Sequence, residues 1–381
     1  DVDAFGTALI SLGLKGKRIA LIGENRYEWS ISYLAVLNGT GIIVPLDKEL
    51  PKNEIANLLT RSKANAIIFT GSKRDDIKDI ARELNTVDFY IDMDAVEDDE
   101  TVMSFGKLLK KGHELVKNGD RSFIDAEIDN EAMNILLFTS GTTDTSKAVM
   151  LSHKNICANL MAMCQMVYID DKDIFLSVLP IHHTYECTCG FLCQLYRGCT
   201  VAYCEGLRHI PKNLAESKAT MMLGVPLIFE AMYKRIWDQA SKSGLDKKLR
   251  TGIKISNLLR KFGIDITKKL FAQVHDSLGG HVRLFISGAA GIDPLVSKGF
   301  RDLGIPLIQG YGLTECAPIV ALNRDVYYKD DAAGLPLPGV EVKIDHPDAD
   351  GVGEIIAKGP NVMLGYYEDE KATSKALKNG W

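Results

Sequence analysis

Short continuous apolar runs alternate with helical patterns along the first part of this chain. The runs comprise residues 19–22, 42–45, 66–70 and 89–91. Helical patterns separate them, one of them at residues 29–37 and another directly after Pro51. Such alternation is typical of βαβ units and of a parallel sheet. Because polar residues do not interrupt the runs, we expect strands that are covered on both faces, in a fold of the α/β class.

A dense run of hydroxyl groups follows a predicted strand at residues 135–138. The run begins with Thr139, Ser140, Gly141, Thr142 and Thr143, and it ends with Ser146 and Lys147. Hydroxyl and backbone donors at this density, with one cation close by, suit the polyphosphate of a nucleoside triphosphate. A Walker A loop has glycine directly before its lysine, whereas this chain has Ser146 there. A P-loop kinase is therefore disfavoured.

Further motifs appear in a fixed order along the rest of the chain. They are GENRYEW at 23–29, SGAA at 287–290, YGLTE at 311–315, GE at 353–354 and KGPNVMLGYY at 358–367. Together with the hydroxyl-rich loop, this ordered set resembles the adenylate-forming (AMP-binding, ANL) superfamily. Within that superfamily the chain looks most like the long-chain fatty acyl-CoA synthetases, or fatty-acid–CoA ligases. The resemblance runs through nearly the whole sequence.

The resemblance implies an N-terminal domain of the acyl-CoA synthetase type, with two doubly wound α/β layers and a small distorted β-barrel. It assigns residues 1–381 to the AMP-binding large domain, with approximate parts 1–130 (first α/β subdomain), 131–320 (nucleotide- and acyl-binding α/β region) and 321–381 (barrel-like region). Two strand-like runs, 340–344 and 354–357, flank turn residues and predict a hairpin in the last part.

Both ends of the chain look truncated beside the family. The resemblance places a ribose-binding aspartate, and a small C-terminal domain with its lysine, beyond Trp381. Without the hydrogen bond of that aspartate to ribose, we expect this chain by itself to bind ATP weakly. Without the positioning that the lysine supplies, we expect it to form little or no acyl-AMP.

Charge and composition exclude several classes of protein. The net charge of -5 argues against a nucleic-acid binder, whose domain is usually basic. The longest apolar region, 174–203, is too interrupted by polar residues to span a membrane. No signal peptide opens the chain, so the expected location is the cytoplasm, possibly with peripheral attachment to a membrane. The eight cysteines show no paired CxxC pattern, and we interpret them as buried, reduced thiols rather than zinc ligands.

The resemblance gives each nucleotide-binding residue a role. Lys147 and the hydroxyl-rich loop would hold the β- and γ-phosphates of ATP. Tyr311 would stack on adenine, with Gly310 and Gly312 beside it, and Thr314 would meet the α-phosphate. Glu315 would hold Mg²⁺, which takes few protein carboxylates and otherwise phosphate and water. The opposite wall of the adenine slot would be Gly288, Ala289 and Ala290.

The acid-binding residues are implied by two further segments. In LPIHHTYE, at residues 179–186, the resemblance places His183 and Tyr185 near the acyl carboxylate. Val225 and Pro226, with Gly312, would complete the acid pocket. Amino-acid-activating relatives carry an aspartate in the first segment, and this chain has none, so an unaminated acid is favoured. The catalytic residues expected are Lys147, Thr314, Glu315 and His183.

Basic residues dominate the segment 234–269. Eleven lysines and arginines stand there against three aspartates, with apolar residues such as Ile255, Leu258 and Phe262 between them. A solvated helical face is the preferred interpretation. Contact with an anionic membrane, where fatty acids partition, is the alternative.

Three positions depart from the family's phosphate loop, which usually has Gly, Pro and Gly where this chain has Asp144, Ser146 and Ala148. Aspartate tolerates a left-handed backbone, so the turn can survive. A carboxylate about 6 Å from a phosphate charge would cost up to about 3 kcal/mol at an effective dielectric of about 20. Asp144 is therefore expected to point outward or to help hold Mg²⁺.

The function expected is activation of a medium- or long-chain fatty acid by ATP, first to the acyl-adenylate and then, with coenzyme A, to acyl-CoA. One alternative is a fatty acyl-AMP ligase that loads a carrier protein. Another, motivated by the altered loop, is a degenerate nucleotide- or acyl-binding protein.

Overall fold

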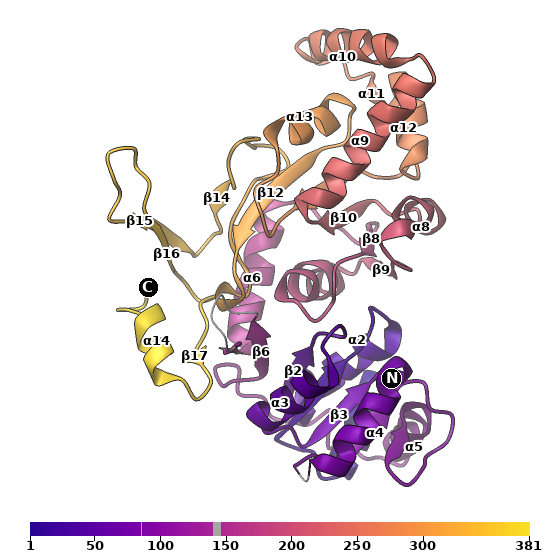
Figure 1. Ribbon diagram of the computed structural model, residues 1–381, viewed down its shortest axis with the longest axis vertical. Coiled ribbons are helices and arrows are strands. Elements are labelled where there is room, and N and C mark those ends of the chain that lie inside the picture. The colour runs from indigo at the N-terminus through magenta and orange to yellow at the C-terminus, as the bar shows by residue number, and fades with distance from the viewer. Residues whose placement is uncertain (85, 140–145) are drawn as a thin grey trace. The chain divides into compact units, whose positions relative to one another are not determined.

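The structure, a computed structural model, describes residues 1–84, 86–139 and 146–381. The chain forms two compact units (Figure 1). The first unit contains residues 1–156 and 363–380, and the second contains residues 157–362 together with Trp381. The predicted parts with boundaries near residues 130 and 320 stay a prediction.

The first unit is built on an eight-stranded sheet with the strand order β17-β7-β6-β2-β1-β3-β4-β5. The strands from β6 to β5 in this order pair in parallel, and β7 and β17 are antiparallel additions at one edge. The first four predicted strands are confirmed as buried members of this sheet. The bounds are β1 (Lys17–Ile22), β2 (Gly41–Leu46), β3 (Ala66–Phe69), β4 (Phe89–Asp92), β5 (Val102–Ser104), β6 (Ile135–Thr139), β7 (Lys147–Leu151) and β17 (Gly365–Tyr366).

Helices connect these strands as the apolar pattern predicts. The predicted helix at 29–37 is α2 (Tyr27–Ala35), which continues as a π-helical turn, η1 (Val36–Thr40). Gly39 has a φ of 151° there, a conformation that only glycine adopts readily, and the turn leads directly into β2. The other helices of the unit are α1 (Val2–Ser11), α3 (Lys52–Ser62), η2 (Gly71–Lys73), α4 (Arg74–Glu83), α5 (Phe105–Lys117) and α14 (Glu370–Ala376).

The second unit is built on a seven-stranded sheet with the strand order β14-β13-β12-β11-β10-β8-β9. The five strands from β12 to β9 in this order pair in parallel, and β13 and β14 are antiparallel. β10 and β11 are buried along their whole length, as expected for central strands of a covered sheet. The bounds are β8 (Ile174–Ser177), β9 (Thr200–Tyr203), β10 (Met221–Gly224), β11 (Leu284–Ser287), β12 (Leu307–Gly312), β13 (Ile319–Leu322) and β14 (Leu335–Pro336).

Helices of the second unit begin where the sequence provides helix-starting residues. Proline stands in the first turn of α8, α9 and α13, where its missing N–H group costs no hydrogen bond. No helix in the described parts of the chain is long and apolar enough to cross a membrane. The helices are η3 (Tyr185–Leu192), α7 (Cys193–Arg197), η4 (Leu207–His209), α8 (Ile210–Ser217), α9 (Pro226–Lys242), α10 (Asp246–Arg260), α11 (Thr267–Leu270), α12 (Ala272–Ser277), α13 (Pro294–Asp302) and η5 (Thr314–Cys316), and α6 (His153–Met166) begins in the first unit.

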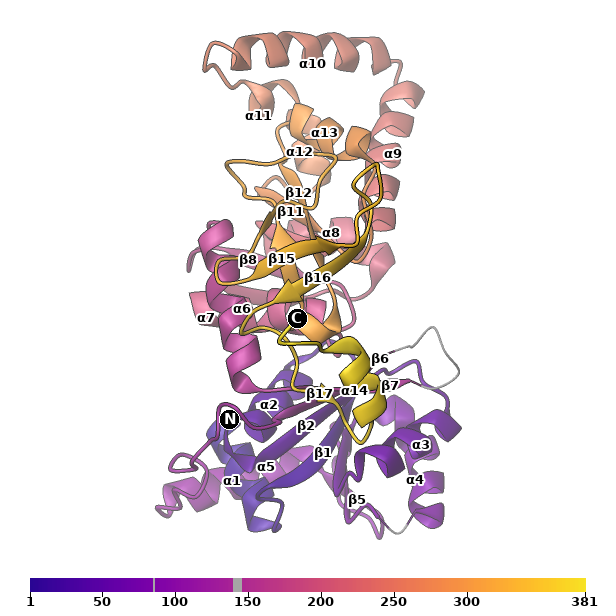
Figure 2. The same cartoon turned by 90° about the vertical axis from the view of Figure 1, so that its left-hand side faces the viewer.

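The hairpin predicted near the end of the second unit is confirmed. It consists of β15 (Glu341–Asp345) and β16 (Glu354–Lys358), which pair antiparallel over five residues each (Figure 2). These two strands form a sheet of their own, whereas β13 and β14, from the same region, extend the large sheet.

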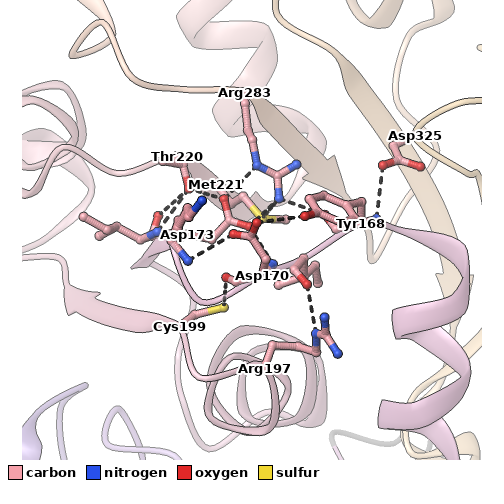
Figure 3. A network of polar contacts seen from close by, with 12 residues as sticks. Tyr168, Asp170, Asp173, Arg197, Cys199, Thr220, Met221, Arg283 and Asp325 are labelled. Atoms are coloured by element: carbon pink, nitrogen blue, oxygen red, sulfur yellow. Dashed lines mark hydrogen bonds and ion pairs between the residues drawn. The ribbon is translucent and has the colours of Figure 1, made fainter.

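An ion-pair network lies at the amino ends of three neighbouring strands of the second unit (Figure 3). Asp173 precedes β8, Thr220 precedes β10 and Arg283 precedes β11. The Arg283 guanidinium donates to both carboxylate oxygens of Asp173, with an Nε–Oδ1 distance of 2.7 Å, and Thr220 Oγ1 donates to the same Oδ1 at 2.7 Å. The Asp173 side chain is only 4% exposed. The network therefore holds three strand ends in register through a charge pair whose carboxylate is nearly buried.

The eight cysteines are free thiols. Five of them are buried, as predicted, but Cys157 is exposed, and Cys164 and Cys204 are half-buried. Cys157 faces outward on α6 because only one side of that amphipathic helix is covered.

Candidate active site

Several loops of the second unit follow neighbouring parallel strands. Residues 179–186 come after β8, Val225 comes after β10, and residues 288–290 come after β11. β12 itself carries residues 310–312 at its carboxyl end. Because the carboxyl ends of parallel strands lie at the same edge, these segments meet there, where open α/β sheets usually bind ligands. The ion-pair network of Asp173 lies at the opposite edge.

A cavity of about 480 Å³ opens among these segments. This volume lies within the usual range for small-molecule sites. It brings together most of the residues predicted for the acid and for adenine. Its lining residues are Leu179, Pro180, His183, Thr184, Tyr185, Glu186, Val225, Ile286, Ser287, Gly288, Ala289, Gly310, Tyr311, Gly312, Leu313, Thr314, Pro318, Ile319 and Leu322.

A second cavity, of about 460 Å³, shares part of this wall. Tyr311 and Gly312 line both cavities, so the exposed ring of Tyr311 stands where they meet. Ala290 lines the second cavity, and so does Asp331, a carboxylate that the sequence motifs did not single out. The remaining lining residues are Ala289, Gly291, Ile292, Pro294, Gln309, Gly310, Ala332 and Ala333.

Tyr185 and Gly288 approach each other closely in the wall of the first cavity. The Tyr185 hydroxyl donates to the backbone oxygen of Ile286 at 3.2 Å. A Cβ atom on Gly288 would lie 2.6 Å from Cζ of the Tyr185 ring, so only glycine fits there. Burial around the hydroxyl, with nearby Cys189 and Glu186, raises the pKa of Tyr185, although part of the ring still faces the cavity. The Tyr185 hydroxyl therefore keeps its proton at neutral pH, in agreement with its hydrogen bond to Ile286.

The neighbouring wall residue Ala289 has a φ of 69°. This left-handed conformation is unfavourable for a residue with a Cβ atom. Such outliers collect at functional sites, where the surrounding structure holds them. Ala289 thus offers its backbone to both cavities in a conformation that the fold imposes.

Two buried asparagines hold the turn that contains Thr314 and Glu315. The Asn159 amide donates to the backbone oxygens of Cys316 and Ile319, at 3.3 and 2.8 Å. The Asn361 amide donates to the same two oxygens, at 3.0 and 3.1 Å. Sequence reasoning gave neither asparagine a role, although Asn361 stands in the motif at 358–367. Thr314 lines the cavity, and the half-buried Glu315 follows it in η5.

Glu186 places a fully buried carboxyl group in the cavity wall. Burial raises its pKa to about 8, while Ser177 and the backbone N–H groups of Leu179 and Val178 act in the opposite direction. These contacts are poorly aligned, since neither carboxyl oxygen has a hydrogen bond of normal geometry among the described residues. Desolvation therefore outweighs them, and the group is mainly protonated at pH 7. The motif at 179–186 contains Glu186, but sequence reasoning gave it no role.

The two histidines of this motif differ in environment. His183 is exposed and lines the cavity, whereas His182 is buried, and their ring centroids are 4.1 Å apart. Val225 lines the cavity too, but Pro226 begins α9 and is not among its described lining residues. Glu315 and Ala290 are likewise outside the lining of this first cavity.

The predicted phosphate loop belongs to the first unit, and its residues 140–145 lie outside the described residues. The predictions for Ser140, Gly141, Thr142, Thr143 and Asp144 therefore stay predictions. On either side of this stretch, Thr139 of β6 pairs with Lys147 of β7. The Lys147 ammonium lies 5.0 Å from the centroid of the Tyr366 ring, which is a cation–π contact.

Arg61 gives the unusual Ser146 a structural partner. Its guanidinium donates to the hydroxyl of Ser146 at 2.8 Å and to the backbone oxygen of Ser146 at 2.6 Å. Ala148, the next departure from the family pattern, is buried in β7 opposite Phe138. Both departures are thus accommodated by the first unit without any distortion of the β6–β7 ladder.

The chemistry of the donors around the two cavities suits a nucleotide and an apolar acid. Tyr311 offers an aromatic face, the backbone at Ala289 and Gly312 lies open, and Thr314 offers a hydroxyl group. Glu315 provides one partly exposed carboxylate, which fits Mg²⁺ because that ion needs few protein ligands beside phosphate and water.

Comparison with known proteins agrees with this arrangement. A profile of the AMP-binding enzyme family matches residues 1–367. The chain is 28% identical to fatty acyl-CoA synthetase A of Dictyostelium discoideum, over 99% of this chain and 59% of that protein. It is also 28% identical to long-chain-fatty-acid–CoA ligase 1 of Cavia porcellus, over 100% of this chain and 59% of that protein. The chain thus spans about three fifths of the length of these relatives.

Solved structures show the same fold. The anthranilate CoA ligase AuaEII in complex with anthranoyl-AMP superimposes with a TM-score of 0.78 at 18% identity, over 100% of this chain and 66% of that one. The N-terminal domain of FACL13 from Mycobacterium tuberculosis superimposes with a TM-score of 0.74 at 20% identity, over 100% and 85%. The predicted α/β fold of an acyl-CoA synthetase N-terminal domain is confirmed, and the chain belongs to the AMP-binding enzyme family.

Proposed function

We propose that the chain is the large domain of an ATP-dependent fatty acyl-CoA synthetase. In the first step a carboxylate oxygen of the acid attacks the α-phosphorus of ATP, the bond to the bridging oxygen breaks, and pyrophosphate leaves. In the second step the thiol sulfur of coenzyme A attacks the acyl carbon, and AMP leaves. Catalysis of the first step is mostly positioning and charge stabilisation.

The observation that carries this proposal is the junction of the two cavities at Tyr311 and Gly312. An adenylate has a nucleotide half and an acyl half that meet at one phosphate. Adenine would stack on Tyr311 between the wall residues 288–290, and the acyl half would occupy the cavity of His183 and Tyr185. Thr314, beside the junction, would meet the α-phosphate. The resemblance assigns the other phosphates to Lys147 and its loop, and Mg²⁺ to Glu315.

The lining of the first cavity supports a fatty acid as the substrate. Its apolar side chains include Leu179, Val225 and Leu322. Among its described lining residues the one acidic residue is Glu186, whose two carboxyl oxygens are buried, so no exposed carboxylate faces a substrate amine. An amino acid would therefore bury an unpaired ammonium group there, at a cost of several kcal/mol. Val225, Gly312 and Tyr185 would contact the acyl group.

A product assay with the full-length protein tests the proposal. The protein receives ATP and Mg²⁺ with acids of 8 to 18 carbons, aromatic acids or amino acids, and with either coenzyme A or a phosphopantetheinylated carrier protein. Mass spectrometry should detect fatty acyl-CoA. Acyl-carrier protein without acyl-CoA would instead identify an acyl-AMP ligase, and no product with any acid would identify a binding protein.

A matched pair of variants localises the activity. His183→Ala should reduce acyl-CoA formation at least 10-fold, because that side chain lines the acid cavity. His281→Ala removes an exposed histidine of the same unit and should leave the rate unchanged. Equal rates for both variants would contradict the assigned role of His183.

A further inference from the structure

Helix α10 exposes apolar side chains along one face. Ile255, Leu258 and Phe262 are 50%, 57% and 74% exposed. At 100° per residue these positions fall within about 60° of one another around the helix axis, so they form one stripe. Phe262 belongs to the turn after α10, and hydrogen bonds from its N–H to Leu259 and from the Gly263 N–H to Arg260 continue the helical path that far.

Lysines border this stripe. Lys254 and Lys261 lie along one side and Lys248 along the other, while Lys247 lies close to the centre of the exposed face. All four are exposed, and none forms an ion pair within the described ranges 1–84, 86–139 and 146–381. Residues 246–264 contain six basic residues and one acidic residue, a local charge of +5 in a chain whose net charge is -5. The basic charge is thus concentrated on this helix.

The opposite face of α10 is firmly attached to the second unit. Gly252 and Ser256 are buried, and a Cβ atom on Gly252 would lie 3.2 Å from the ring of Phe271. The Arg260 guanidinium donates to the backbone oxygens of Arg301 and Asp302, both at 3.0 Å. The exposed stripe is therefore a fixed feature of a packed helix. In Figures 1 and 2, α10 lies at the end of the second unit, beyond α11 and α13.

We propose that this face of α10, with Ile255, Leu258 and Phe262 ringed by lysines, docks the protein onto anionic phospholipid membranes. An interfacial helix with an apolar stripe and flanking lysines inserts its side chains at the boundary of headgroups and acyl chains. The lysines meet the negative surface potential of the leaflet. Charge complementarity selects the partner, because four unpaired cations beside exposed apolar groups match anionic headgroups above hydrocarbon. This surface is separate from the active site and independent of the proposed enzymatic activity.

Binding to vesicles, measured by sedimentation without ATP or fatty acid, tests this proposal. The protein should bind vesicles with 30% phosphatidylserine at least 10-fold more tightly than pure phosphatidylcholine vesicles, and 0.5 M salt should weaken the binding. K254E/K261E should reduce affinity for the anionic vesicles at least 10-fold, and I255S/L258S/F262S should do the same. K172Q/K329Q and V326S/V352S change exposed residues of the same unit and should have little effect.

Insertion depth is tested with Phe262→Trp. Its added fluorescence should be quenched by brominated acyl chains in anionic vesicles, whereas adding these vesicles to the parent protein should quench its own tryptophans, Trp29, Trp237 and Trp381, much less. Absence of vesicle binding, or binding that K254E/K261E and K172Q/K329Q reduce equally, would overturn the proposal. The proposal would also be overturned if the protein bound heparin at least as tightly as anionic vesicles and showed no quenching at position 262. That result would identify a surface that binds polyanions in general.

Discussion

Replacement of the buried Glu186 by glutamine should change how the stability of the second unit depends on pH. The folded state holds the Glu186 proton up to a pKa of about 8, whereas the ordinary pKa of an exposed glutamate is 4.5. Between these two values the unfolded state is ionised and the folded state is protonated. Stability therefore falls as the pH rises from about 4.5 to 8, by up to about 1.4 kcal/mol per pH unit, and then levels off.

The magnitude follows from these two values. Between pH 5 and pH 8, the Glu186 contribution to the free energy of unfolding should fall by about 3 kcal/mol in the parent protein. The amide group introduced by Glu186→Gln cannot ionise, so this contribution disappears in the variant. The constant cost of packing an amide instead of a carboxyl cancels, because only the pH-dependent difference between the two proteins is compared.

Urea unfolding at pH 5, 6, 7 and 8 measures this difference. A Trp29→Phe background restricts tryptophan fluorescence to Trp237 and Trp381, which both belong to the second unit. Glu341→Gln, at an exposed position of the same unit, is the matched control and should leave the pH dependence unchanged. If Glu186→Gln and the parent keep a constant stability difference from pH 5 to pH 8, then the carboxyl is not held protonated and the desolvation argument fails.

Three further predictions follow from other contacts. Arg283→Met should lower the free energy of unfolding by about 3–5 kcal/mol near pH 7, because it leaves the nearly buried Asp173 carboxylate unpaired. Burial alone would raise the pKa of Asp173, but hydrogen bonds from Arg283 and Thr220 hold this pKa below the usual value. The loss of stability in Arg283→Met should therefore shrink as acid protonates the carboxyl. A loss of stability that is independent of pH in chemical denaturation would contradict this. Gly288→Ala should lower kcat/KM for the fatty acid at least 10-fold by displacing Tyr185, and unchanged kinetics would refute the close approach. Lys147→Ala should raise KM for ATP about 10- to 100-fold and leave fatty-acid binding intact, whereas equal losses of both would indicate a folding role through Tyr366.

The fold was predictable from sequence because its strands are strongly marked. The runs that form β1 to β4 are continuous and apolar, and pairing in a covered parallel sheet requires that pattern. The hairpin β15–β16 was predictable from its turn residues. The π-helical turn η1 was not, because its geometry depends on a local conformation at Gly39 that a periodicity pattern does not encode.

The lining of the candidate site was predictable where a short motif carries its own chemistry. His183, Tyr185, Gly288 and Tyr311 come from three separate motifs, and the structure brings them to one cavity. Residues that act through tertiary contacts escaped prediction. Asn159 and the sites it contacts are about 160 residues apart, and Glu186 is unusual only because the fold buries it.

A similar tertiary contact gives Ser146 a partner that the sequence did not predict. Judged against the family pattern, Ser146 appears only as a serine in place of the usual proline of the phosphate loop. In the folded first unit, Arg61, 85 residues earlier in the chain, donates to both its hydroxyl and its backbone oxygen. A sequence pattern around position 146 contains no information about this partner.

Exchange of labelled pyrophosphate into ATP by the full-length protein tests the proposed adenylation most directly. The exchange reports formation of the acyl-adenylate alone and needs neither coenzyme A nor a carrier protein. The exchange should require a fatty acid and Mg²⁺. It should fall at least 10-fold in Tyr311→Ala, which removes the ring at the junction of the two cavities. Tyr327→Ala, at an exposed position of the same unit, should leave the exchange rate unchanged. Fatty-acid-dependent exchange that Tyr311→Ala leaves intact, or no exchange with any acid, would contradict the proposal that these cavities hold an acyl-adenylate.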